Sequence, residues 1–337
     1  MVKFFEQRLK ELYANIAGKR IAVVGDLMLD RYLWGTVTRI SPEAPVPIVE
    51  VDYESSRLGG AANVANNIKS LGGIPILIGV AGNDPAAGIL RSIMEENGFP
   101  TEGLIIDERR PTTVKTRVIA HNQHVVRIDQ EAKHDISPFL QQQVLAYLRS
   151  QIYSIDAMII EDYNKGVIAN DLIAPLIQLA NDYRKTVTVD PKFNNFFNFK
   201  NVTVFKPNRN EVEEALGMKF YNEKIVEEAG KILLEKLNAR YVLLTRGEKG
   251  MSLFEREGNA THMPTKALEV ADVSGAGDTV ISTLTMVLAG GGSIQEAATL
   301  ANYAGGVVCG EIGIVPITLD GLTQAATNDN DPLNTGV

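Results

Sequence analysis

The 337-residue sequence is poor in cysteine, histidine and tryptophan, with one, four and one of each. The single cysteine, Cys309, excludes an intramolecular disulfide and fits a reducing compartment. The histidines and the cysteine show none of the spacings typical of a zinc site. Basic residues are also few, since 33 lysines and arginines against 41 acidic residues leave a net charge of −8. That balance argues against a general nucleic-acid-binding or anionic-membrane surface.

The sequence also lacks long apolar runs. No window approaches the ~18 consecutive apolar residues that a membrane span requires. Residues 1–20 carry charges throughout, so they do not form the apolar core of a signal peptide. Apolar side chains recur in this segment at helical spacing, which predicts an amphipathic helix over residues 3–17. We therefore expect a cytoplasmic protein.

Short β-branched apolar runs alternate along the chain with segments of helical periodicity. Strands are predicted at residues 20–24, 74–80, 156–160, 186–190, 202–205 and 240–245. Helices are predicted at residues 61–71, 85–97, 137–152, 169–184, 208–216, 223–237, 277–290 and 294–309. This alternation is typical of a doubly wound, mostly parallel α/β sheet with helices on both faces. We expect one domain over residues 1–325 and a polar tail over 326–337.

Two segments break the alternation. Residues 32–52 and 112–129 each contain an extended pattern without helical periodicity, and the second resembles a hairpin around residues 121–123. Ligands of doubly wound proteins bind at the carboxyl edge of the sheet. The two segments are therefore predicted to form a small lid of β-ribbons over that edge.

The segment Asp272-Val-Ser-Gly-Ala-Gly-Asp278-Thr runs directly into an apolar helix. Gly275 and Gly277 allow consecutive N–H groups to point at one spot, and the start of the helix adds further N–H donors and the positive end of its dipole. Such a turn suits a phosphoryl group. A phosphate repels a carboxylate at this place, so Asp278 makes sense as the base that accepts a proton from an attacking hydroxyl.

Other interpretations of this short segment stay open. Asp278 could cap the helix, as aspartate often does, and Gly-x-Gly-Asp alone is weak evidence. The segment is neither a dinucleotide fingerprint nor a Walker-A loop, because the further glycine or Gly-Lys-Thr is missing.

Together with Gly59-Gly60-Ala-Ala-Asn63, the glycine-rich segment resembles the paired signatures of the ribokinase-like (phosphofructokinase B) sugar kinases. The resemblance covers residues 18–325 and implies the ribokinase-like fold, with ATP and Mg²⁺ as cofactors. Four further segments resemble the kinases of D-glycero-D-manno-heptose 7-phosphate within that family. They begin at Gly25, Arg39, Asp162 and His262.

The resemblance implies phosphorylation of the C1 hydroxyl of heptose 7-phosphate. The product, heptose 1,7-bisphosphate, leads to nucleotide-activated heptose for lipopolysaccharide or surface glycans. Asp278 is then the base, and the anion hole consists of Gly275, Ala276 and Gly277.

For the sugar hydroxyls the resemblance implies Asp26, with Asp30 as a second candidate that could instead pair with Arg31 in a turn. Gly59, Gly60 and Asn63 are also implied in sugar binding, although the glycines could serve helix–sheet packing. Asp162, in the same predicted turn as Lys165, could contact the substrate or organise the metal, and Asp190 completes the candidate substrate set.

A 7-phosphate needs cations, and any one candidate could be a solvated surface charge. We favour the two that follow predicted strands. The candidates are Arg39, Lys115, Arg117 and the favoured pair, Lys165 and Lys192.

The nucleotide-binding residues implied by the resemblance are Asn208, Thr245, Gly247, Gly250 and Asn302. Glu211 is implied to hold Mg²⁺ through water, although Asn208 and Glu211 also have the spacing of a helix capping box. Asn302 could instead be a half-buried polar residue of its helix.

Many relatives fuse the kinase to a nucleotidylyltransferase. No nucleotidylyltransferase sequence is seen after residue 325, so we expect a separate nucleotidylyltransferase to act downstream. The ribbons predict a homodimer, because exposed strand edges need covering. Alternatives are a kinase of this fold for another sugar, sugar phosphate or nucleoside, and a non-catalytic sugar-binding protein. A nucleotide-linked oxidoreductase is excluded by the missing dinucleotide fingerprint.

Overall fold

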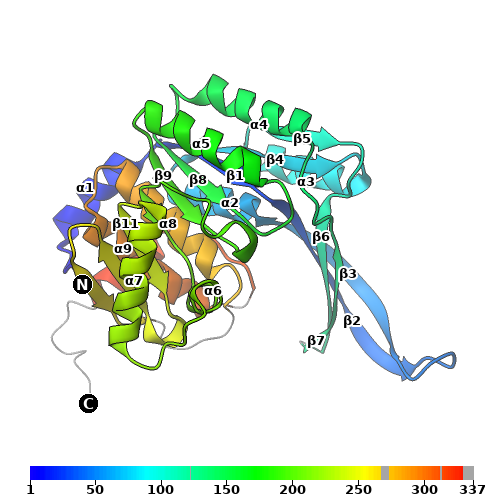
Figure 1. Cartoon of the computed structure of the whole chain (residues 1–337). Helices are drawn as coiled ribbons and strands as arrows, with labels where there is room; N and C mark the ends of the chain where they lie inside the picture. Colours follow the sequence, from blue (N-terminus) through cyan, green and yellow to red (C-terminus); the bar gives the residue numbers. More distant parts are fainter. Residues whose placement is uncertain (122, 267–272, 312, 329–337) are drawn as a thin grey trace, which may run out of the picture.

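The computed structural model of the chain describes residues 1–121, 123–266, 273–311 and 313–328. Asp272, which opens the glycine-rich segment, and residues 329–337 of the predicted tail lie outside the described residues. The described chain forms an α/β body from which an arm of β-strands projects (Figure 1).

A nine-stranded sheet runs through the body in the order β13-β12-β11-β10-β9-β8-β1-β4-β5. Neighbouring strands from β11 to β5 are parallel, and β12 and β13 are antiparallel. The mostly parallel sheet predicted from the sequence is therefore confirmed. The strands are β1 (Arg20–Gly25), β4 (Ile74–Gly82), β5 (Leu104–Asp107), β8 (Ala157–Glu161), β9 (Thr186–Asp190), β10 (Val204–Phe205), β11 (Tyr241–Thr245), β12 (Met251–Glu255) and β13 (Ala260–Met263).

Helices cover both faces of this sheet, because strand residues alternate between two apolar cores. Along β1, Val23 belongs to one core and Val24 to the other. The first core includes α1 (Glu6–Ile16), α2 (Ala61–Ser70), α3 (Pro85–Glu96), α8 (Ala276–Ala289), α9 (Ile294–Cys309) and α10 (Leu319–Asn328). The second includes α4 (Pro138–Gln151), α5 (Asn170–Asp182), α6 (Arg209–Leu216) and α7 (Glu223–Leu237). Within the described residues, no helix is both long and apolar enough to cross a membrane.

Several elements were not predicted. The strands β5 and β13 have four residues each and lie at the two edges of the sheet, where a periodic pattern cannot develop. The strand β12 and the helix α10 were also missed. Because α10 packs Leu322 and Ala326 into the first core, the start of the predicted polar tail is helical instead.

The arm is one four-stranded sheet in the order β3-β2-β6-β7. Parallel pairing of β2 with β6 joins the two predicted ribbons, and the first ribbon is longer than predicted. The hairpin predicted around residues 121–123 connects β6 to β7, and residue 122 lies outside the described residues. The base of the arm meets the carboxyl edge of the body sheet (Figure 1). The strands are β2 (Leu27–Ile40), β3 (Pro47–Gly60), β6 (Thr113–Ala120) and β7 (Gln123–Gln130).

Candidate active site

The polar candidates gather where β1, β8 and β9 end. Asp26 follows β1, Glu161 is the last residue of β8 and Asp190 is the last residue of β9. Glu161 pairs in register with Gly25 on one side and with Asp190 on the other. This is the sheet edge at which doubly wound proteins bind ligands.

The first turn of α8 carries the predicted anion hole. Gly275 is the N-cap residue with a φ of 79°, a left-handed conformation that favours glycine. A Cβ on Gly277 would lie 3.5 Å from the Lys206 Nζ atom, so the turn passes directly beside this ammonium. The N–H groups of a first helical turn lack intrahelical acceptors. Gly275, Ala276 and Gly277 therefore form a positive turn beside the Lys206 ammonium.

Asp278 lies in the same turn and is 5% exposed. Its Oδ2 atom accepts a hydrogen bond from Asn63 Nδ2 at 2.7 Å, and its Oδ1 atom accepts one from the Tyr163 hydroxyl at 2.7 Å. Burial raises the pKa of Asp278 to about 6, although both hydrogen bonds lower it. Because Gly275 is the N-cap, the alternative in which Asp278 caps the helix is wrong.

Glu161, Asp190 and Asp278 each offer a carboxylate oxygen, and these oxygens lie within 4.8 Å of one another. Burial raises the pKa of Glu161 well above its usual range, and the charges of the other two carboxylates add to the effect. The Oε2 atom of Glu161 is buried without a hydrogen-bond partner. An oxygen-only donor set of this kind suits a hard divalent cation such as Mg²⁺.

Lys206 balances part of this negative charge. Its Nζ atom lies 2.7 Å from Asp190 Oδ2, and the side chain is 3% exposed. Burial lowers the pKa of Lys206, but the carboxylates of Asp190 and Glu161 outweigh burial and raise the pKa above its usual value. Lys206 therefore carries a fixed positive charge beside the anion hole.

Asp26 does not take the position expected for a sugar ligand. Its Oδ2 atom accepts hydrogen bonds from the N–H groups of Tyr163 at 2.7 Å and Lys165 at 3.1 Å. Its Oδ1 atom accepts one from the Val167 N–H group at 3.0 Å, and the residue is 1% exposed. Asp26 instead anchors the loop after β8, because buried backbone donors require acceptors.

Asp30 lies on β2 at the base of the arm. It forms a buried ion pair with Arg117 on β6, and not the predicted alternative pair with Arg31. A Cβ on Gly59 would overlap the Asp30 carboxylate, so glycine is needed at position 59. Gly60 has a φ of 56° and abuts the backbone of Asp26, which is the packing role foreseen as its alternative. A side chain at position 59 or 60 would therefore overlap a neighbouring residue.

The cations predicted for the 7-phosphate have different surroundings. Lys165 lies 2.7 Å from Glu131, and Lys192 lies 2.5 Å from Glu211, so both favoured lysines are already paired. Among the described residues, no carboxylate lies within ion-pair distance of Lys115, and burial lowers the pKa of this lysine. Lys115 pairs in register with Asp30 at the base of the arm. Of the predicted cations, it is therefore the one with charge to offer a phosphate.

Arg39 lies away from the site. It follows Asp30 by nine residues along β2, which is roughly 30 Å at the rise of an extended strand. Its side chain is 67% exposed and lies 3.9 Å from Glu50. The prediction that Arg39 contacts the substrate of its own chain is therefore wrong.

Asp162 organises the loop after β8. Its Oδ1 atom accepts a hydrogen bond from the Asn164 N–H group at 2.8 Å, and its Oδ2 atom accepts one from Asn195 Nδ2 at 3.0 Å. Burial and the charge of Asp26 raise the pKa of Asp162 to about 7. Both carboxylate oxygens of Asp162 therefore already have protein partners.

The residues predicted to bind the nucleotide begin at α6. Asn208 and Glu211 form the capping box that the sequence allowed: Asn208 Oδ1 accepts from the Glu211 N–H group at 3.0 Å, and Glu211 Oε2 accepts from the Asn208 N–H group at 2.8 Å. The other oxygen of Glu211 faces Lys192. Lys192 thus links Glu211 to the acidic cluster of Glu161, Asp190 and Asp278. Both carboxylate oxygens of Glu211 have protein partners.

The turn between β11 and β12 holds Thr245, Gly247 and Gly250 beside Asn208, which forms a β-bridge with Thr245. Gly250 has a φ of 76°, and a Cβ there would overlap the backbone of Met263. Gly247 has a φ of 60°. The two glycines are therefore required by the shape of the turn.

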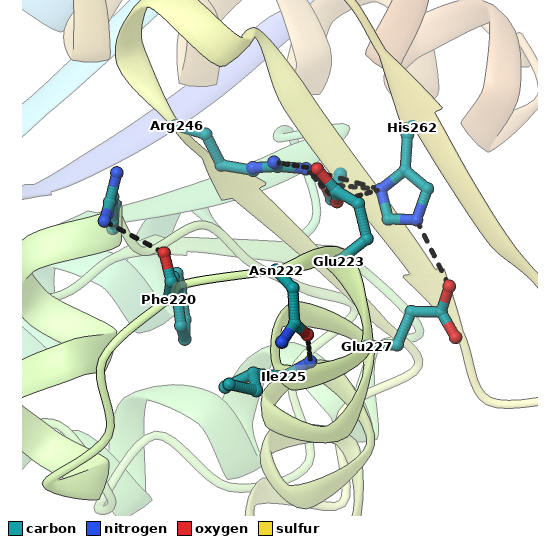
Figure 2. Close-up of polar contacts among 9 residues, drawn as sticks. Phe220, Asn222, Glu223, Ile225, Glu227, Arg246 and His262 are labelled. Carbon is teal, nitrogen blue, oxygen red and sulfur yellow. Dashed lines mark hydrogen bonds and ion pairs between the residues drawn. The ribbon is translucent and has the colours of Figure 1, made fainter.

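Arg246, inside this turn, is held from the side by α7. Its guanidinium donates to both oxygens of Glu223 at 2.6 and 2.8 Å and to the Ser252 hydroxyl at 2.8 Å. Figure 2 shows His262 beside this pair, with Glu227 on the far side of its ring. His262, from a motif singled out in the sequence, thus supports the turn between β11 and β12.

Asn302 on α9 is 3% exposed, and its Nδ2 atom donates to the Pro264 carbonyl at 2.8 Å. This arrangement matches the buried polar residue that the sequence left as an alternative to an adenine contact.

Sequence reasoning missed Glu161, Tyr163 and Lys206. Glu161 ends β8 and Tyr163 follows Asp162, but spacing alone cannot tell which of these three consecutive side chains faces the site. Lys206 directly follows β10, so the strand-end position that singled out Lys192 also pointed to Lys206.

Relatives of known name match most of the chain. It is 42% identical over 307 residues to the bifunctional protein HldE of Geobacter sulfurreducens, covering 91% of this chain and 63% of that protein. It is also 42% identical over 302 residues to the bifunctional protein HldE of Helicobacter pylori, covering 90% and 65%. The chain thus spans less than two thirds of the length of these relatives.

Solved structures share the fold. Phosphofructokinase-2 of Escherichia coli superposes with a TM-score of 0.75 at 18% identity, covering 94% of this chain and 100% of that one. Ribokinase of Arabidopsis thaliana, solved with ribose and ATP, gives a TM-score of 0.71 at 17% identity, covering 92% and 99%. The ribokinase-like fold predicted from the sequence is confirmed. Residues 19–318 match the pfkB family of carbohydrate kinases, and the chain therefore belongs to that family.

Proposed function

We propose that the protein transfers the γ-phosphoryl group of ATP to the C1 hydroxyl of D-glycero-D-manno-heptose 7-phosphate, giving heptose 1,7-bisphosphate. The observation that carries this proposal is Asp278, whose buried carboxylate is held at both oxygens beside the positive first turn of α8. A pKa of about 6 leaves this carboxylate ionised at neutral pH and basic enough to accept a proton.

In the proposed reaction, Asp278 accepts the proton of the C1 hydroxyl while the hydroxyl oxygen attacks the γ-phosphorus. The bond from this phosphorus to the ADP oxygen breaks in line. Positioning and charge stabilisation supply most of the catalysis in such transfers. The N–H groups of the turn at Gly275, Ala276 and Gly277, together with the Lys206 ammonium, stabilise the charge on the transferring group.

Mg²⁺ fits the acidic cluster, because the buried Glu161 Oε2 atom has no hydrogen-bond partner and Asp190 lies next to it. We assign Glu161 and Asp190 to the metal, with Glu211 acting through water. When bound, the ion neutralises charge on the phosphates of ATP.

The choice of heptose 7-phosphate rests on the four resembling sequence segments and on the relatives named HldE. We assign Asp30, Gly59 and Asn63 to the sugar hydroxyls and Lys115 to the 7-phosphate, because Lys115 pairs in register with Asp30 and, unlike Arg117, has no ion pair among the described residues. Heptose activation by a nucleotidylyltransferase is the step proposed downstream. A kinase that draws on ATP also fits the cytoplasmic location expected from the sequence.

The test is release of ADP from ATP and Mg²⁺ across a panel of acceptors. The panel contains heptose 7-phosphate, unphosphorylated heptose, fructose 6-phosphate, fructose 1-phosphate, ribose and adenosine. We expect turnover with heptose 7-phosphate to exceed that with every other acceptor. Preference for another acceptor would overturn the substrate assignment and keep the kinase, and sugar binding without any turnover would overturn both.

A further inference from the structure

Tyr163 lies at the centre of the candidate site and has no role in the reaction proposed above. It is the second residue after β8, in the loop that Asp26 anchors through the N–H groups of Tyr163, Lys165 and Val167. Three hydrogen bonds to one buried carboxylate fix the backbone of this loop. The position of the Tyr163 side chain is therefore set before any ligand binds.

The hydroxyl of Tyr163 donates to Asp278 Oδ1 at 2.7 Å. Asn63 donates to the other oxygen of Asp278. Two donors on two different oxygens fix the rotation of the carboxylate, while each oxygen keeps a lone pair for a substrate hydroxyl.

The ring of Tyr163 contacts two lysines from different parts of the site. The Nζ atom of Lys115, from the arm, lies 5.5 Å from the ring centroid, and the Nζ atom of Lys192 lies 5.4 Å from it. Lys192 in turn pairs with Glu211 on the nucleotide side. One aromatic ring thus supports a cation on the sugar side and a cation on the nucleotide side.

We propose that Tyr163 is a positioning residue with two separable parts, whose hydroxyl orients the base Asp278 and whose ring orients Lys115 toward the phosphate of the acceptor. This inference rests on the proposed function, because it takes Asp278 as the base of a sugar-phosphate kinase. It predicts that the two parts can be removed one at a time.

Two variants separate the parts. Tyr163→Phe keeps the ring and removes the hydroxyl, so kcat should fall by about 10- to 100-fold, the loss typical of a hydrogen bond to a charged group. KM for the sugar phosphate and for ATP should change by no more than about twofold, because the ring still supports Lys115 and Lys192. Tyr163→Leu should show the same loss in kcat and, in addition, a rise of about tenfold in KM for the sugar phosphate.

The matched control is Tyr153→Phe. Tyr153 is exposed at the end of α4, where its hydroxyl contacts only the Tyr183 hydroxyl among the described residues, so its kinetics should equal those of the wild type. A wild-type kcat for Tyr163→Phe, or equal changes in kcat and in both KM values, would overturn the proposal.

A crystal structure of Tyr163→Phe gives a second readout that needs no turnover. The Asp278 carboxylate should leave the orientation that it has in the wild type, while the loop held by Asp26 stays in place. An unmoved Asp278 would overturn the positioning role. Failure of the proposed function would give a different result. The wild-type protein would then show no turnover of heptose 7-phosphate, whatever the orientation of Asp278.

Discussion

Burial controls the protonation of Asp278. Its pKa is raised to about 6 from an ordinary value of 3.8 because the ionised carboxylate is desolvated. A base must be ionised, so activity is present above this pKa and is lost as the pH falls through it. We predict that kcat/KM falls by about tenfold for each pH unit below about pH 6, and steady-state rates between about pH 5 and about pH 8 check this.

Circular dichroism across the same range is the control for unfolding. A kcat/KM that is flat down to about pH 5 in folded protein would contradict the role of Asp278 as the base.

Lys115 is half-buried and has no carboxylate partner among the described residues, so a phosphate would supply its missing counter-charge. We predict that Lys115→Ala raises KM for heptose 7-phosphate by roughly 10- to 100-fold, as expected for a lost charge-assisted contact. KM for unphosphorylated heptose should not change, because that acceptor has no phosphate. Steady-state kinetics with both acceptors measure the difference.

Lys10→Ala is the control for Lys115→Ala, because Lys10 lies on the exposed face of α1 and, within the described part of the chain, pairs only with Glu6. Equal changes in KM for both acceptors in Lys115→Ala would show that Lys115 does not bind the phosphate.

At the residue scale, the sequence predicted groups whose role is local. Asp278 and its glycines lie in one turn, so their chemistry follows from seven consecutive residues. The sequence could not show which of Asp26 and Asp30 is the better candidate for sugar binding. Which of them faces the loop after β8 depends on contacts between residues more than 130 positions apart. The favoured lysines were likewise misjudged, because Glu131 and Glu211, which neutralise them, are distant in sequence.

The turn between β11 and β12 depends on a neighbouring helix. Glu223 at the start of α7 holds the guanidinium of Arg246, whose side chain is 5% exposed. We predict that Glu223→Gln raises KM for ATP by about three- to tenfold and leaves kcat at saturating ATP nearly unchanged, because it weakens a charge-assisted contact that only shapes the turn. ATP titrations of the two proteins measure this.

Glu227→Gln, one helical turn along α7, is the matched control, since the one ion pair of Glu227 among the residues that the structure describes is with His262 at 3.5 Å, and Glu227 is 44% exposed. If both variants have the wild-type KM for ATP, the network shown in Figure 2 does not support nucleotide binding.

At the element scale, periodicity predicted the long helices and the buried strands, because each forms its pattern within one segment. It missed the short strands β5 and β13, which are too brief to show a period. It also could not show that the two ribbons form one sheet, since that depends on the parallel pairing of β2 with β6 across about 80 residues.

The arm gives the whole molecule an exposed sheet with two open edges, β3 and β7 (Figure 1). Every residue of β7 is exposed, including Val126 at 48% and Ile128 at 55%. Exposed apolar strands and open edges favour pairing with a second copy. We propose that the arm forms the homodimer expected from the sequence.

Light scattering after gel filtration tests this proposal. We predict a dimer for the wild type, and a monomer when Val126 and Ile128 are both replaced by lysine, because two buried charges per subunit oppose association. Phe139→Lys, an exposed apolar position on α4, is the control and should stay dimeric. A monomeric wild type would rule out the arm as a dimer interface.

The proposed reaction depends on one proton acceptor, so Asp278→Asn is its most direct test. The variant keeps the size of the side chain and removes the base. We predict that kcat for heptose 7-phosphate falls by about 10²- to 10⁴-fold, while the dissociation constant for heptose 7-phosphate, measured by calorimetry, stays close to the wild-type value. A variant that binds the sugar phosphate and turns over near the wild-type rate would contradict the account.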